Sequence, residues 1–166
     1  MGIASDAMVF ARKVHAEQKR KYTGNPYFDH LAEVAGIIST VASQYAWPDH
    51  VIATAWLHDC VEDHQVEWRI LHNIFGIQVA DGVFLLSDRE TEGNRATRKA
   101  ASIERLSKAP AWVQSIKCAD LISNTSSIVL HDPKFAVTYL EEKRLLLDVL
   151  TKADPRLLAM ALHSLP

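Results

Sequence analysis

Hydrophobic residues recur every three or four positions along most of the chain, and the alternation typical of β-strands is scarce. This spacing predicts helices at about residues 5–19, 30–41, 48–63, 66–75, 77–86, 97–108, 111–130, 134–152 and 155–164. The stretch Tyr22–Pro26 is expected to be a turn, and the polar stretch Ser87–Arg95 a surface loop. No repeat or linker divides the sequence, so we expect one all-α domain over residues 1–166, with about eight to ten helices.

The charge balance excludes one class of partner. The 166 residues include 18 Lys and Arg against 20 Asp and Glu, a formal net charge of −2. No chain-wide positive field is available to bind nucleic acid through its phosphates, so no nucleic-acid partner is expected. The eight histidines are a high count for a protein of this length and call for an explanation.

Sequence features also bear on location and on the two cysteines. The N-terminal segment lacks an uninterrupted apolar region of the kind found in signal peptides, and no stretch approaches the roughly 20 apolar residues of a membrane span. We therefore expect a cytoplasmic protein without a membrane partner. Cys60 and Cys118 stand far apart, which argues against a disulfide framework and a thiolate metal site, and both are expected to be buried as small hydrophobic residues.

The segment Leu57–Asp63 carries the densest chemistry of the chain. On a helix, Glu62 lies one turn beyond His58 and Asp63 one turn beyond Asp59. His58 and Asp59 differ by about 100° around the helix axis, so a metal ion between their directions can take a ligand from both. The preceding residues are almost wholly apolar, and burying several acids and an imidazole there is costly without an ion or partners.

Two further residues extend this set. His30 lies on the apolar stripe of its helix, and Asp120 stands among apolar neighbours inside another predicted helix. Imidazole and carboxylate donors together suit a divalent transition metal such as Mn, Fe or Zn. His15, on an apolar helix face, fits equally a core position and a supporting position near such a site. The remaining histidines are expected at the surface: His50, His64, His72, His131 and His163.

The order of these residues resembles the HD-domain metal phosphohydrolases. More closely, the chain is similar to the hydrolase domain of RelA/SpoT proteins and to the stand-alone small alarmone hydrolases over about residues 4–150. The matching stretches are His15–Lys21, Gly24–His30, Trp56–Asp63, Phe75–Gly76 with Val79, Gly93–Lys99, and Lys117–Asp120 with Asn124. The chain departs from the usual pattern at Leu121, where the family usually has a basic residue, and this leaves the choice of nucleotide open.

The resemblance implies a role for nine residues. It implies one Mn²⁺, with other divalent transition metals also suited, held by His30, His58, Asp59 and Asp120. It also implies that Glu62 and Asp63 handle the attacking water, and that Arg20, Lys21 and Asn124 contact the substrate. Since the net charge is slightly negative, local basic residues must offset the phosphates of the substrate. Arg95, Arg98 and Lys99 form a second basic patch, for which a solvated helix face is the favoured interpretation.

The leading functional hypothesis is hydrolysis of the 3′-pyrophosphate of the guanosine alarmones ppGpp and pppGpp, which gives GDP or GTP and pyrophosphate. One alternative is a metal-dependent phosphohydrolase with another small-molecule nucleotide, namely an adenosine alarmone, NADPH or a nucleoside monophosphate. The other is a non-catalytic module that binds an alarmone. The leucine runs 145–147 and 157–158 are consistent with core positions or with a homodimer face, and core positions are favoured.

Overall fold

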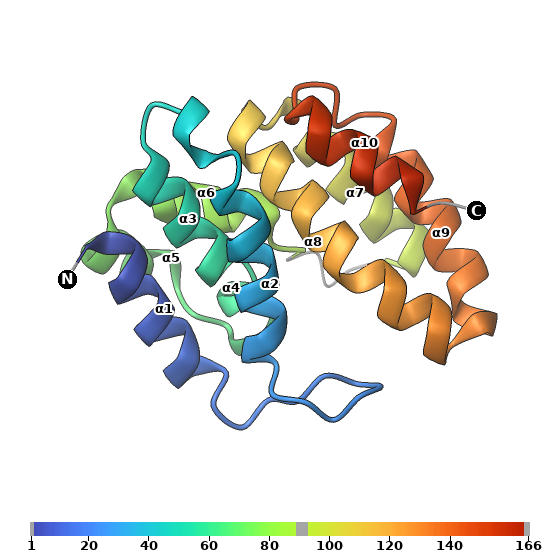
Figure 1. The fold of residues 1–166 in the computed structure, drawn as a ribbon, viewed down its shortest axis with the longest axis horizontal. Helices are drawn as coiled ribbons and strands as arrows, with labels where there is room; N and C mark the ends of the chain where they lie inside the picture. Colours follow the sequence, from blue (N-terminus) through green and yellow to red (C-terminus); the bar gives the residue numbers. More distant parts are fainter. Residues whose placement is uncertain (1, 89–92, 165–166) are drawn as a thin grey trace. The chain divides into compact units, whose positions relative to one another are not determined.

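The computed structural model describes residues 2–88 and 93–164. These residues form ten α-helices and one 3₁₀-helix, shown in Figure 1. The elements are α1 (Ile3–Val14), α2 (Phe28–Ser39), η1 (Ala42–Gln44), α3 (Pro48–Leu57), α4 (Cys60–His64), α5 (Trp68–Phe75), α6 (Ile77–Leu86), α7 (Arg95–Lys108), α8 (Ala111–His131), α9 (Pro133–Leu147) and α10 (Pro155–His163). The β-structure in this part of the chain is an isolated antiparallel bridge between Lys19 and Pro26. The all-α prediction is therefore confirmed.

The helices fall into two compact units, Met1–Ser87 and Asp88–Pro166. The first unit contains α1–α6, and the second contains α7–α10. The single domain expected over residues 1–166 stays a prediction. In the residues that the structure describes, no helix is both long enough and apolar enough to cross a membrane.

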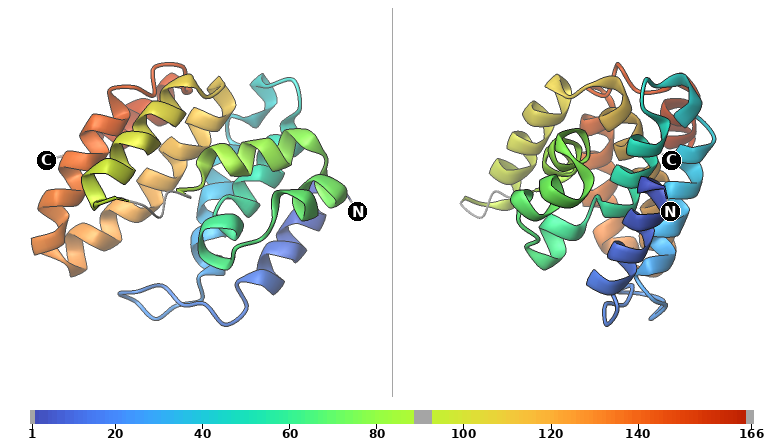
Figure 2. Two further views of the ribbon diagram at one scale, coloured as in Figure 1. Left: turned by 180° about the vertical axis from the view of Figure 1, so that it is seen from behind. Right: turned by 90° about the vertical axis from the view of Figure 1, so that its left-hand side faces the viewer.

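The first unit is built around α3. Helices α1, α2 and α6 all pack against it, and Figure 2 shows α1 and α2 beside α3 in both views. Buried residues occur on several sides of α3, including Val51, Ala53, Ala55 and Leu57. A helix that is apolar on most of its circumference is stable only when other elements surround it. The end of α3, where the predicted metal ligands begin, is consequently held inside a packed core.

The predicted first helix extends too far. Helix α1 ends at Val14 rather than at about residue 19. The chain then forms a short hairpin, in which the Tyr27 amide donates to the Gln18 carbonyl (2.9 Å) and the Arg20 amide donates to the Asn25 carbonyl (2.8 Å). These bonds replace the helical ones, and Gly24 turns the hairpin with a φ of 70°. The basic stretch 19–21 therefore lies in a loop and not at a helix end.

The uninterrupted helix predicted over residues 48–63 is also wrong. Helix α3 ends at Leu57 and α4 begins at Cys60, so His58 and Asp59 lie in the junction. Their side chains bond instead to the Ala55 carbonyl and the Tyr27 hydroxyl. The predicted separation of one helical turn between Asp59 and Asp63 does hold, because the Asp63 amide donates to the Asp59 carbonyl at 2.9 Å.

The second unit is organised by the 21-residue helix α8, against which α9 and α10 pack. Helix α9 ends at Leu147 and not at 152, because side chains of α8 bind the backbone that follows. Gln114 Oε1 accepts from the Lys152 amide (2.8 Å), and Ser115 Oγ accepts from the Asp154 amide (2.7 Å).

Two further predictions concern the second unit. The core interpretation of the leucine runs is confirmed for Leu146, Leu147 and Leu157, whereas Leu145 is 57% exposed. Of the predicted loop Ser87–Arg95, residues 89–92 lie outside the described residues. Asn94 caps α7 by accepting from the Thr97 amide, so that helix begins at Arg95 rather than at 97.

A lysine is buried inside the second unit. Lys143 of α9 is 2% exposed, and its amine donates to the hydroxyls of Thr125 (2.9 Å) and Ser164 (2.6 Å). Burial lowers the pKa of Lys143 to about 8. The folded chain therefore binds this proton more weakly than the unfolded chain, and protonation costs stability below pH 8. That cost disappears as the pH rises from about 8 toward the unfolded value of 10.5.

We expect Lys143→Met to raise the free energy of unfolding at pH 7 by roughly 2 kcal/mol, because it removes a charge that is costly to bury. The gain should shrink as the pH approaches 10, where the wild-type lysine is neutral when folded. Urea unfolding at pH 7 and pH 10 measures both values. Lys134→Met, at an exposed position of the same helix, is the matched control. An equal change at both pH values would contradict the prediction.

Candidate metal centre

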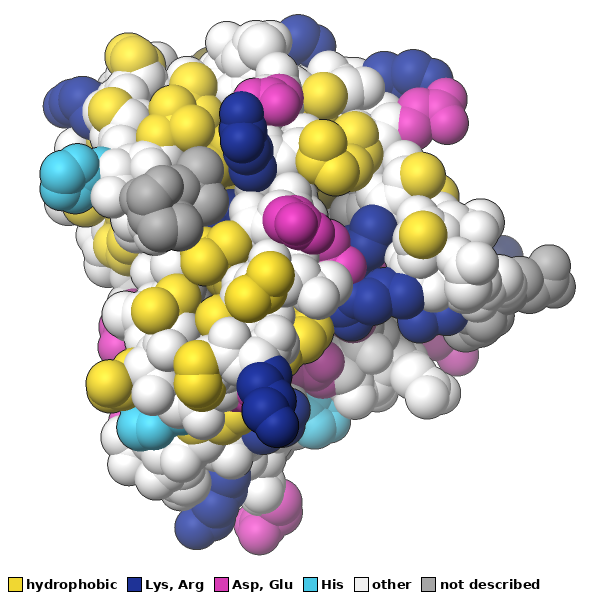
Figure 3. All heavy atoms as spheres, turned by 90° about the vertical axis from the view of Figure 1, so that its right-hand side faces the viewer, with side chains coloured by type: hydrophobic (Ala, Val, Ile, Leu, Met, Phe, Trp, Pro, Cys, Tyr) yellow, Lys and Arg dark blue, Asp and Glu magenta, His cyan; other side chains and the backbone are white. Residues whose placement is uncertain are grey.

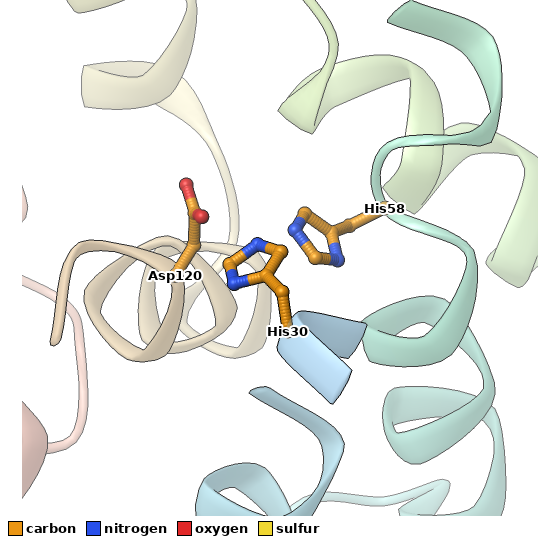
Figure 4. Close-up of side chains that lie close together, drawn as sticks. All are labelled: His30, His58 and Asp120. Atoms are coloured by element: carbon orange, nitrogen blue, oxygen red, sulfur yellow. The ribbon is translucent and has the colours of Figure 1, made fainter. Parts of the chain in front are cut away.

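Two buried histidines and an aspartate meet in the first unit. His30, in the first turn of α2, is 0% exposed, and His58, directly after α3, is 3% exposed. Asp59 Oδ2 lies 3.5 Å from His30 Nε2 and 3.0 Å from His58 Nε2. The two imidazole rings are 5.2 Å apart between centroids, and Figure 4 shows them facing each other. The structure thus brings together three of the four predicted ligands within one compact unit.

The ring orientation of His58 indicates a cation site. Its Nδ1 lies 2.8 Å from the Ala55 carbonyl oxygen, which accepts hydrogen bonds only, so this nitrogen carries the proton. In a neutral imidazole the other nitrogen, Nε2, then presents a lone pair toward the Asp59 carboxylate. A lone pair and a carboxylate oxygen 3.0 Å apart repel each other unless a proton or a cation neutralises them. Histidines that bind metals commonly donate their second N–H to a backbone carbonyl in this way.

Tyr27 orients Asp59. The sequence had indicated no role for Tyr27. Its hydroxyl donates to Asp59 Oδ2 at 2.7 Å, and its backbone carbonyl accepts from the His30 amide at 3.0 Å. One residue therefore fixes the carboxylate and the start of the helix that carries His30. The sequence signal for this role was the position of Tyr27 three residues before His30. Its partner Asp59, however, lies 32 positions further along the chain.

The fourth predicted ligand, Asp120, belongs to the second unit. It is 6% exposed on α8, so its carboxylate is buried within that unit. Lys117 donates to its Oδ2 (2.8 Å) and Asn124 donates to its Oδ1 (2.7 Å). Both partners come from the same helix, three and four residues away, and together they fix the carboxylate. Asn124, predicted to contact substrate, thus donates a hydrogen bond to Asp120. The sequence had indicated no role for Lys117 in holding this carboxylate.

The donor set suits a divalent transition metal. In the first unit, His30 and His58 each offer a ring nitrogen and Asp59 offers a carboxylate oxygen. Asp120 is a buried carboxylate of the second unit. Mixed imidazole and carboxylate sets of this kind bind Mn, Fe and Zn in proteins, and they do not depend on a thiolate. The two thiols are indeed buried, as expected, and burial raises the pKa of Cys118 to about 12.

The predicted pair of acids lies on α4, next to the ligands. Glu62 and Asp63 are both exposed, and Asp63 Oδ2 accepts from the side-chain Nε2 of Gln18 at 2.8 Å. Partial desolvation of its carboxylate, followed by the negative charge of Asp59, raises the pKa of Asp63 above its ordinary value. An acid of raised pKa close to the predicted metal ligands is suited to accept a proton from a water molecule.

The two basic patches differ in their surroundings. Arg20 is half-buried in the hairpin after α1, and the exposed Lys21 lies over the Tyr22 ring, 4.9 Å from its centroid. In the second patch, Arg95 binds Glu142 through two hydrogen bonds, and Lys99 binds Asp88 at 2.8 Å. The second patch therefore takes part in ion pairs within its own unit. On the face drawn in Figure 3, basic and acidic side chains are interspersed with hydrophobic ones.

Comparison with known proteins identifies the family and confirms the fold. The model of the HD domain family matches residues 7–133. A Drosophila melanogaster relative, guanosine-3′,5′-bis(diphosphate) 3′-pyrophosphohydrolase MESH1, is 28% identical over 129 residues, which cover 77% of this chain and 70% of the relative. A probable enzyme of the same activity from Synechocystis is 31% identical over 134 residues, 77% of this chain but 17% of that protein. This chain therefore corresponds to about one sixth of the cyanobacterial relative.

Two solved structures share the fold. A metazoan ortholog of SpoT, described as hydrolysing ppGpp and acting in starvation responses, superimposes with a TM-score of 0.87 at 24% identity. The match covers 99% of this chain and 94% of the ortholog. The lmo0812 protein of Listeria monocytogenes superimposes with a TM-score of 0.68 at 23% identity, over 87% of this chain and 96% of that protein. The all-α fold expected from the sequence is the fold of these proteins.

Proposed function

Because the chain belongs to the HD domain family, we propose that it is a metal-dependent hydrolase that removes the 3′-pyrophosphate from guanosine alarmones, giving GDP or GTP and pyrophosphate. The observation that carries the proposal is the buried cluster of His30, His58 and Asp59, in which one carboxylate oxygen approaches the Nε2 atoms of both imidazoles, an arrangement suited to a cation. Similarity to a 3′-pyrophosphohydrolase over 70% of that relative's length supports the choice of substrate.

We propose that His30, His58, Asp59 and Asp120 hold one Mn²⁺. When bound, such an ion acts as a Lewis acid on phosphoryl oxygens and lowers the pKa of water. The protein's own contribution is to fix the donors. The Ala55 carbonyl sets the ring of His58, Tyr27 sets Asp59, and Lys117 with Asn124 sets Asp120.

Glu62 and Asp63 are proposed to act on the attacking water. A carboxylate there accepts a proton from water as the water oxygen bonds to phosphorus. The bond from that phosphorus to the 3′ oxygen breaks, the 3′ oxygen takes up a proton, and pyrophosphate leaves. General-base help of this kind is worth about 10²–10⁴-fold. Arg20, Lys21 and Asn124 are proposed to bind the nucleotide. An arginine guanidinium can bind phosphate oxygens with two hydrogen bonds or stack on a base, and a lysine supplies a point charge. A single functional domain over residues 1–166 and a cytoplasmic location stay predictions.

A panel of nucleotides tests the proposal. Purified chain with Mn²⁺ is offered ppGpp, pppGpp, an adenosine alarmone, NADPH and GMP. Release of pyrophosphate and of phosphate is measured, and the substrates are ranked by kcat/KM, the ratio in which specificity resides. We expect pyrophosphate release with the guanosine alarmones ranked first, and complete loss of release with EDTA. Release that persists with EDTA would contradict the metal-dependent mechanism.

Two other outcomes would favour the alternatives. A higher kcat/KM for another nucleotide would identify a different substrate, and the departure at Leu121 is the feature that makes this alternative worth testing. Tight alarmone binding without turnover, across several divalent ions, would indicate a binding module. The presence of both Glu62 and Asp63 favours catalysis over binding alone.

A further inference from the structure

A single glutamine connects the acid pair with two histidines outside the proposed ligand set. The carboxamide of Gln18, in the turn after α1, lies between Asp63 on one side and His15 and His64 on the other. Its Nε2 donates to Asp63 Oδ2 at 2.8 Å. Its Oε1 lies 2.5 Å from His15 Nδ1 and 2.6 Å from His64 Nε2. All four residues belong to the first unit.

The chemistry of these groups leaves one arrangement of protons. An ionised carboxylate only accepts hydrogen bonds, so the NH₂ group of Gln18 must face Asp63 and its oxygen must face the two imidazoles. That oxygen also only accepts, so each facing ring nitrogen carries a proton. His15 is therefore protonated at Nδ1, and His64 at Nε2. In neutral His15 the other nitrogen, Nε2, is left as an acceptor, 3.6 Å from Cys60 Sγ.

The contacts of Gln18 favour one orientation of its carboxamide. His15 is 1% exposed, stacks on Tyr27 with ring centroids 5.3 Å apart, and meets the edge of His64 at 4.4 Å. A reversed carboxamide would direct its NH₂ at two N–H groups and its oxygen at a carboxylate. The contact between the amide oxygen and the carboxylate would be repulsive in every case, and both imidazoles would have to change tautomer to accept from the NH₂ group.

We propose that Gln18 is a positioning residue for Asp63, and that His15 and His64 fix the direction in which it donates. With Oδ2 held by Gln18, the second oxygen of Asp63 is left to accept a hydrogen bond from the attacking water. The inference rests on the proposed function, in which Asp63 acts on that water. It assigns roles to Gln18 and to His64, which the sequence placed at the surface without a function.

The substitution Gln18→Glu tests the role with almost no change of shape. The new carboxylate still accepts from both imidazoles but no longer donates to Asp63. We expect kcat for pyrophosphate release to fall about 10- to 100-fold, the usual cost of losing a group that orients an active-site residue, while KM and bound Mn²⁺ stay unchanged. Gln44→Glu, at an exposed position on η1, is the matched control for the added charge.

Nuclear magnetic resonance of the imidazole nitrogens supplies a readout that does not depend on turnover. In the wild-type chain, His15 should be protonated at Nδ1 and His64 at Nε2. In Gln18→Ala, His15 should lose its preference for Nδ1. If Gln18→Glu folds poorly, His64→Ala removes one support of the carboxamide at an exposed position and should lower kcat about threefold.

The outcomes separate this inference from the proposed function. A wild-type chain that releases neither pyrophosphate nor phosphate from any nucleotide overturns both. An active wild-type chain, together with Gln18→Glu of unchanged kcat, overturns the inference alone. The same holds for a wild-type His15 protonated at Nε2, because the oxygen of Gln18 would then not face it.

Discussion

Substituting Asp59→Asn is expected to lower pyrophosphate release on the order of 10³-fold or more and to lower the amount of bound Mn²⁺. Asp59 is the carboxylate that meets both buried imidazoles, at 3.5 Å from His30 and 3.0 Å from His58. Asparagine keeps an oxygen that accepts from the Tyr27 hydroxyl, so the fold around the junction of α3 and α4 should persist. The negative charge that attracts a cation is lost.

Metal content of the purified variant and its kcat/KM for ppGpp, both relative to wild type, measure this effect. Asp49→Asn, at an exposed position in the first turn of α3, is the matched control and should change neither. An Asp59→Asn variant that retains its metal and loses less than tenfold in activity would show that Asp59 is not a ligand. The mechanism would then have to be assigned to other residues.

The second large effect is expected from Asp63→Asn, which should lower kcat by about 10²–10⁴-fold with the metal retained. Asparagine still accepts from Gln18 but cannot take up a proton from water. Glu62→Gln should cost less, because Asp63 is the member of the pair that Gln18 holds in place and whose pKa is raised by desolvation and by Asp59.

Single-turnover kinetics of both variants, with metal content measured in parallel, decide between the two acids. Glu67→Gln, at an exposed position just before α5, controls for the loss of an acidic side chain. A larger loss in Glu62→Gln than in Asp63→Asn would assign the proton transfer to Glu62. It would also remove the basis for a positioning role of Gln18.

Local patterns predicted most of the helices, and tertiary contacts changed their ends. The helix predicted to run to about residue 19 ends at Val14, and the chain instead forms a hairpin in which the Tyr27 amide donates to the Gln18 carbonyl. In the same way, the bond of His58 to Ala55 and that of Asp59 to Tyr27 accompany the break between α3 and α4. Because such bonds join residues that no local pattern connects, helix periodicity does not contain them.

The sequence by itself determined the all-α class, the family resemblance and the identity of the candidate ligands. These depend on residue types at fixed spacing, such as His58 followed directly by Asp59, and spacing can be read without coordinates. Only the tertiary structure decided how the candidate ligands and the acid pair are held. Tyr27 reaches Asp59 across 32 positions, and Gln18 reaches Asp63 across 45. The direction of a hydrogen bond depends on where the folded backbone places both partners, so the positioning roles of Tyr27 and Gln18 became visible only in the fold.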